Sequence, residues 1–170
     1  MFVHDRATGT TSLISVGLTG LSGSGASALP SITADGRFVA FCSSASDLVP
    51  GDTFDFDVFV RDRQTGSTTK VGPCVSAGPP ALSGDGRWVA FSTYVAVIPG
   101  DTNGSLDVYL YDRQTGVTTK VSTGPGGLQG NENSFAPAIS SDGRWIAFAS
   151  VASNLVSGDT NGMTDIFVSA

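Results

Sequence analysis

The chain alternates short apolar runs with clusters of turn-forming residues. The runs are rich in Val, Ile, Phe, Tyr and Thr and are bounded by Gly, Asp and Pro, and no long window places apolar residues at helical spacing. Runs of this length and composition are typical of β-strands joined by tight hairpins. The pattern therefore predicts an all-β protein.

The same order of segments occurs three times along the 170 residues. Each repeat holds an Asp-Gly-Arg turn, an apolar run, a Gly-Asp-Thr loop, a second apolar run and an Asp-Arg-x-Thr-Gly turn. When each unit is counted from the start of one Asp-Arg-x-Thr-Gly turn to the start of the next, the repeat units are approximately 5–61, 62–111 and 112–169 of one domain. Positions that coincide between repeats are called slots below.

The runs within each repeat predict four strands. Asp-Gly is a preferred hairpin turn because Gly takes positive φ freely and Asp tolerates it. Continuous apolar runs such as 88–91 fit strands that are buried on both faces between neighbouring sheets. Four-stranded units at this spacing are typical of β-propeller blades. We therefore predict β-propeller blades of four antiparallel strands, about three in number, which form an open arc or half-ring.

Two segments carry a family resemblance. Residues 30–41 (PSITADGRFVAF) and 137–148 (PAISSDGRWIAF) resemble the repeat of TolB-type, WD40-like β-propellers of bacterial envelope and secreted proteins. The resemblance implies a non-enzymatic scaffold for protein or ligand binding, located in the periplasm or secreted. Two alternatives stay open, namely the propeller portion of a hydrolase or lyase that gates substrate, and a calcium-stabilised surface or adhesion module.

Three blades are fewer than the roughly four to eight of a closed propeller. The two outer blade faces are therefore expected to be apolar and uncovered, and we expect a protein partner to cover them. That partner is either the remainder of a longer propeller or a second copy in a head-to-tail homodimer.

Charge and hydropathy narrow the class of partner. The net charge is -6, but most of the aspartates occupy repeated turn slots, and the nine basic residues form no stripe. Nucleic-acid binding is therefore not expected. No apolar run is long enough to cross a bilayer, so membrane insertion is not expected either.

The loops before the third strand of the second and third repeats are candidate calcium sites. Oxygen ligands recur in them around a Gly-permitted turn, as in short calcium loops. The alternative is turn chemistry alone, because Asp and Asn side chains bond their own backbone amides. The candidate ligands are Asp101, Asn103, Asp107, Asp159, Asn161 and Asp165.

The best candidate for a partner-specific surface is the variable segment 129–135, between the predicted fourth strand of one blade and the start of the next. Loops that vary on a repeated scaffold are where recognition is usually placed, although Gly-rich sequence also fits a flexible linker. The candidate binding residues are Gln129, Asn131, Glu132, Asn133 and Phe135.

No catalytic residue is predicted. His4 is the only histidine and Glu132 the only glutamate, and no nucleophile elbow accompanies them. The Arg of each Asp-Gly-Arg turn is expected to pair with a repeat Asp across its blade, because Arg forks suit carboxylates.

Cys42 and Cys74 have no counterparts in the other repeats. One ends an apolar run and the other follows a Pro. We expect two unpaired small residues, with a disulfide as the open alternative.

Overall fold

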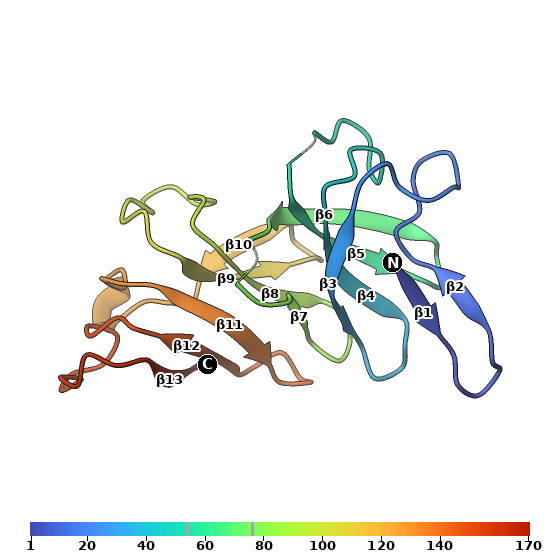
Figure 1. Cartoon of the computed structure of the whole chain (residues 1–170). Coiled ribbons are helices and arrows are strands. Elements are labelled where there is room, and N and C mark those ends of the chain that lie inside the picture. The colour runs from blue at the N-terminus through green and yellow to red at the C-terminus, as the bar shows by residue number, and fades with distance from the viewer. Residues whose placement is uncertain (54, 76) are drawn as a thin grey trace.

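The computed structural model describes residues 1–53, 55–75 and 77–170. It consists of antiparallel sheets that lie side by side, from the blue N-terminal end to the red C-terminal end of Figure 1. The N-terminal ribbon contains β1 (Phe2–His4) and β2 (Thr11–Leu13). The first blade contains β3 (Ser27–Ile32), β4 (Phe38–Ser43), β5 (Asp57–Asp62) and β6 (Ser67–Pro73).

Two further blades follow in the same order along the chain. The second blade contains β7 (Ala81–Leu82), β8 (Trp88–Thr93), β9 (Asp107–Asp112) and β10 (Val117–Lys120). A short 3-10 turn, η1 (Pro125–Gly127), leads to the third blade, which contains β11 (Ser134–Ile139), β12 (Ile146–Ser150) and β13 (Asp165–Ser169). The prediction of four-stranded antiparallel propeller blades in an open arc is confirmed.

The sheets start at a different point of the repeat from the units counted in the sequence. The unit 62–111 contains β6 of the first blade together with β7, β8 and β9 of the second. Each counted unit therefore supplies the fourth strand of one sheet and the first three strands of the next.

Three apolar layers hold the sheets together. All six residues of β4 are buried, because Val39 and Phe41 face the N-terminal ribbon while Phe38 and Ala40 face the second blade. A third layer lies between the second and third blades, where Val108 packs in one cluster with residues of β12. The continuous apolar runs are thus strands covered on both faces, as predicted.

The outer faces of the arc are uncovered. Val58 and Val60 of β5 are 1% and 0% exposed, whereas Ile166 and Val168 of β13 are 72% and 64% exposed. Phe2 is exposed at the other end of the arc. No helix among the described residues combines the length and apolar character needed to cross a membrane.

The glycines of the second and third Asp-Gly-Arg turns allow neighbouring blades to approach closely. Gly86 lies under the ring of Phe38, and Gly143 lies under the ring of Trp88, so that a Cβ at either position would overlap the ring of the preceding blade. Both glycines have φ near +70° (68° and 73°), which disfavours any other residue.

The expectation of two unpaired cysteines is wrong, because Cys42 and Cys74 form a disulfide. Cys42 lies on the face of β4 that meets the second blade. The chain leaving β6 stays over β5, since the Cys74 amide donates to the Phe56 carbonyl (2.8 Å), and this brings the two Cα atoms to 6.0 Å. Their separation of 32 residues in sequence conceals this proximity, which depends on the strand order.

Candidate functional site

The loop before the third strand brings two aspartates to one lysine of the fourth strand. In the second blade, Lys120 Nζ lies 3.1 Å from Asp101 Oδ1 and 2.7 Å from Asp107 Oδ2. The side chains of Lys120 and Asp101 are 4% exposed, and that of Asp107 is fully buried. We call this arrangement, one ammonium between two carboxylates, the lysine clamp.

The first blade has the same clamp. Lys70 Nζ lies 2.8 Å from Asp52 Oδ1 and 2.6 Å from Asp57 Oδ2. Here the lysine side chain is 36% exposed, although both carboxylates are buried. The clamp is therefore a repeated feature of this chain, and it ties the loop to the edge of the sheet.

The charges of the clamp stabilise one another. Burial raises the pKa of Asp57 above its ordinary value, although Lys70 opposes that effect. Burial also opposes the charged form of Lys70, but its contacts with Asp52 and Asp57 outweigh this and raise its pKa. In the second blade, burial and a hydrogen bond to Asp101 raise the pKa of Tyr109. Each clamp thus holds its own cation.

The candidate calcium ligands of the second repeat lie in this clamp. Lys120 takes the place between Asp101 and Asp107 that a cation would need. Asn103 accepts from the Ser105 amide (3.1 Å), a contact typical of a turn, and donates to the Gly130 carbonyl (2.9 Å), which ties the loop to the segment before the third blade. In the described part of the chain, no three His, Cys, Asp or Glu side chains are grouped as metal ligands.

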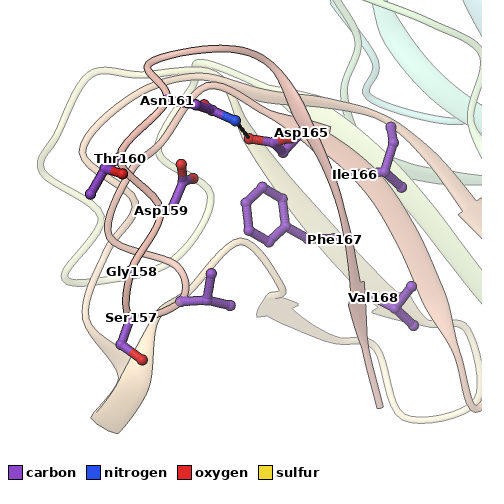
Figure 2. A pocket seen from close by; sticks show the side chains of 10 residues that line it. Ser157, Gly158, Asp159, Thr160, Asn161, Asp165, Ile166, Phe167 and Val168 are labelled. Atoms are coloured by element: carbon purple, nitrogen blue, oxygen red, sulfur yellow. Dashed lines mark hydrogen bonds between the residues drawn. The ribbon is translucent and has the colours of Figure 1, made fainter.

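The corresponding loop of the third blade differs. Asp159, Asn161 and Asp165 border an open hollow of about 540 Å³, which Phe167 also lines (Figure 2). Asn161 donates to Asp165 (2.9 Å) and accepts from the amide of Met163 (2.8 Å). No lysine of the described residues pairs with these aspartates, and the third sheet as described has three strands, β11-β12-β13, without the strand that carries the lysine in the other two blades.

The predicted binding segment is fastened to its neighbours. Gln129 accepts from Lys120 Nζ (3.2 Å) and from the Thr102 amide (3.3 Å). Asn133 accepts from the amide of Leu106 (2.9 Å). The segment therefore braces the loop of the second blade.

The remaining candidates of that segment point in different directions. Asn131 donates to Ser153 Oγ (3.0 Å), and Phe135 lies in β11 opposite Ala149, half-buried. Glu132 is exposed to solvent. The structure thus brings Gln129 next to the clamp and leaves Glu132 as the exposed charge of the segment.

The predicted pairing of turn arginines with repeat aspartates is confirmed in two blades. Arg37 Nε and Nη2 donate to the two carboxylate oxygens of Asp62 (3.1 and 2.9 Å), and Arg87 makes the same fork with Asp112 (2.9 and 2.7 Å). These forks hold the pKa of Asp62 and of Asp112 well below its ordinary value. In the third blade Ala170 occupies the aspartate slot, so Arg144 has no such fork and keeps the stacking over Trp145 (4.8 Å), a contact that Arg87 also makes with Trp88.

His4 lies on the exposed side of the N-terminal ribbon. Its Nδ1 is 2.9 Å from the hydroxyl of Thr11 on the neighbouring strand. This places the histidine in a cross-strand contact.

The fold can now be compared with known proteins. No protein-family model matches the chain, and no curated protein matches it. TolB from Acinetobacter baumannii shares its fold at 22% identity with a TM-score of 0.50, over 97% of this chain and 36% of TolB. A prolyl endopeptidase aligns at 15% identity and a TM-score of 0.57, over 98% of this chain and 24% of its own. Oligogalacturonate lyase from Vibrio parahaemolyticus aligns at 16% identity and a TM-score of 0.55, over 99% and 40%.

These likenesses establish the fold. The chain has a TolB-like β-propeller fold, and the same fold occurs in propeller domains of enzymes. It spans less than half the length of each of these three proteins. At identities this low, activity and partners do not carry over from one protein to another.

The lysine clamp was not predicted from the sequence, although a signal for it exists. Lys70 and Lys120 are the only lysines in the chain, and each stands eight residues after the aspartate of an Asp-Arg-Gln-Thr-Gly turn. A lysine that recurs at the same strand slot indicates a recurring acidic partner, and the strand order shows which aspartates lie beside it.

Proposed function

We propose that the chain is a non-enzymatic β-propeller scaffold that binds a protein or another ligand outside the cytoplasm. The observation that carries the proposal is that the charged side chains of the repeat slots hold one another. Lys120 binds Asp101 and Asp107, while Arg87 forks onto Asp112. Charges that are committed to fixed ion pairs position strands, whereas general acid–base catalysis needs a titratable group that can exchange its proton with a substrate.

The uncovered ends of the arc support a binding role. Ile166, Val168 and Phe2 expose apolar side chains in the positions that neighbouring blades cover elsewhere in the molecule. Exposed apolar surface of this kind is typical of sites of association. The location outside the cytoplasm follows the resemblance to TolB-type propellers.

A substrate panel tests the scaffold proposal. The purified chain is incubated with chromogenic peptide, ester and glycoside substrates, and we expect rates equal to those without protein. Reproducible turnover that disappears in His4→Ala or in Asp165→Asn would overturn the proposal.

The likeness to a prolyl endopeptidase and to oligogalacturonate lyase favours one second candidate. In it, the chain is the propeller portion of a hydrolase or lyase and gates the substrate. A hydrolase or lyase domain encoded in the same reading frame supports this candidate, and a frame without one counts against it.

A calcium-stabilised module is another candidate function, and the loop of the third blade supports it. The carboxylate oxygens of Asp159 and Asp165 could bind calcium, since no lysine of the described residues lies between them. Calorimetric titration with calcium should then give stoichiometric heat. Asp159→Ala should abolish that heat, while Asp101→Ala, whose carboxylate already binds Lys120, should leave it. A titration without heat removes the idea.

A further inference from the structure

Two hollows meet at Arg61, between the N-terminal ribbon and the first blade. The larger, of about 450 Å³, is bordered by the loop after β2, the loop after β4 and the start of β6. The smaller, of about 180 Å³, is bordered by β2, Arg61 and Arg63. We call the two hollows together the Arg61 groove. All of its bordering residues lie between positions 12 and 68, so the chain itself supplies both walls.

The cation of this groove has no acidic partner. Arg61 Nη1 donates to the hydroxyl of Thr68 (2.9 Å), which stands opposite it in the ladder. Among the residues that the structure describes, the arginines that form ion pairs are Arg37 and Arg87, and no carboxylate borders either hollow. A guanidinium has five N–H donors, so Arg61 keeps donors for a ligand.

The second blade fills the same slot with an aromatic residue. Tyr111 stands there, opposite Thr118, and packs against the apolar layer between the first two blades. Arg61 is half-buried and borders two hollows instead. Because a partly buried cation without a counter-ion opposes folding, packing alone does not explain an arginine in this slot. An anionic ligand explains it.

The two hollows of the groove differ in character. In the smaller one, Arg63 adds a second positive charge, and its Nη1 donates to the Gly36 carbonyl (2.6 Å). The larger one is bordered by Leu18, Leu48 and Val49. Leu18 is 61% exposed, whereas Leu48 belongs to the apolar layer between the ribbon and the first blade. The groove thus offers donors for an anion next to an apolar surface.

We propose that the Arg61 groove binds a segment of a partner protein in which an acidic side chain stands next to an apolar one. The carboxylate accepts from the guanidinium of Arg61 in the smaller hollow, and the apolar side chain lies against Leu18 and Val49 in the larger. Arginine suits this role because its fork matches a carboxylate. This inference rests on the proposed scaffold function and names the chemistry of the partner.

The shape and charge of the groove favour an acidic polypeptide segment. Sites for small molecules are concave and bury most of the ligand, whereas Leu18 and Pro50 border the larger hollow from exposed positions. The net charge of the chain is -6, yet of the described residues that border the groove two are arginines and none is acidic. The groove is therefore complementary to an acidic partner although the chain as a whole is not.

Nuclear magnetic resonance titration of the whole, isotope-labelled chain tests the proposal. The probe is the acetylated and amidated peptide Gly-Ser-Glu-Leu-Ser-Gly, and the matched control has Gln in place of Glu. We expect the Glu peptide to shift the Arg61 Nε–H and Thr68 amide signals and to bind about fivefold more tightly than the control or better, since charge-assisted forks are stronger than neutral hydrogen bonds. A peptide with Ala in place of Leu should bind more weakly than the probe, because less apolar surface is buried.

Substitutions at Arg61 locate the binding. Arg61→Tyr installs the residue that the second blade has in this slot, so we expect the variant to fold and to lose the preference for the Glu peptide. Arg61→Gln should lose it as well. Arg144→Gln removes an exposed arginine of the third blade and should leave the preference unchanged. Thermal unfolding followed by circular dichroism checks that each variant is folded.

Several results would overturn the proposal. They are equal affinities for the Glu and Gln peptides, no shift at the Arg61 groove in the low millimolar range, or an unchanged preference in a folded Arg61 variant. A homodimer with the Arg61 groove in its interface would assign the groove to a second copy and also reject the proposal. None of these results touches the scaffold proposal, which fails only if the chain turns over a substrate.

Discussion

The second and third blades carry the same residues in most slots, yet those residues have different environments. Arg87 stacks over Trp88 at 4.6 Å and Arg144 over Trp145 at 4.8 Å, so the local turn is the same. Only Arg87 also forks onto an aspartate. The fork is absent from the third blade because Ala170 stands in the slot of Asp112. The lysine clamp, in contrast, depends on a neighbour, because Lys120 lies on the fourth strand, β10, which has no counterpart in the described third sheet. Burial and pairing of a repeat slot are therefore decided by what packs next to it.

The largest expected effect comes from breaking the clamp of the second blade. Lys120→Met leaves Asp101 and Asp107 buried without their cation, and we expect the free energy of unfolding to fall by about 3–5 kcal/mol. Asp165→Asn in the third blade should change it by less than about 0.5 kcal/mol, because that carboxylate has no lysine partner. Urea unfolding monitored by circular dichroism measures both, and similar losses would contradict the comparison.

The second-largest expected effect comes from the Asp-Gly-Arg turn of the third blade, whose glycine packs against the ring of Trp88. Gly143→Ala drives a Cβ into the ring of Trp88, whereas at Gly36 only a flexible arginine, Arg63, lies within reach. Both positions have positive φ, of 73° and 71°, so the backbone strain is common to the two variants. We expect Gly143→Ala to cost about 1–3 kcal/mol more than Gly36→Ala in the same urea experiment. Equal losses of unfolding free energy in the two variants would mean that the turn at Gly143 does not pack against the ring of Trp88.

A smaller effect distinguishes the two stacked arginines. Arg87→Ala loses the fork onto Asp112 as well as the stacking on Trp88, while Arg144→Ala loses only the stacking on Trp145. Because Arg87 is 38% exposed, the extra loss should be no more than about 1 kcal/mol. Thermal melts of the two variants measure it, and a larger loss in Arg144→Ala would show that the third blade has an aspartate partner elsewhere.

The smallest effect is a dependence on pH. The folded state lowers the pKa of Asp112, so the contribution of this carboxylate to stability is present above its unfolded pKa of about 4 and is lost as the pH falls through the folded value. The difference in melting temperature between the wild type and Asp112→Asn should therefore be greatest near neutral pH and shrink in acid. A difference that grows toward acid would reverse the sign of the linkage.

Much of the fold was predictable from the sequence, since strands and turns are local. The Asp-Gly-Arg turns and the runs after them were predicted from residues within a few positions of each other. The pairing of the turn arginines with a repeat aspartate followed from the geometry of an arginine fork, but the sequence did not say which aspartate, and for Arg87 it is Asp112. The disulfide of Cys42 with Cys74 and the clamp of Lys120 with Asp107 depend on which strand lies beside which. Gln129 was named as a candidate binding residue, and its contacts with Lys120 and Thr102 could not be predicted, because the partners of a loop residue come from the packing of a neighbouring loop.

Hydrogen exchange of β9 and β13 in the free protein tests the central claim most directly. β9 is paired on both sides and β13 on one side only, although the two strands occupy the same slot. We predict that amides of β9 exchange slowly along the whole strand and that those of β13 facing the open edge exchange at least tenfold faster. Equal, slow exchange in both strands would contradict the account, because it would show that the edge of the third blade is already covered.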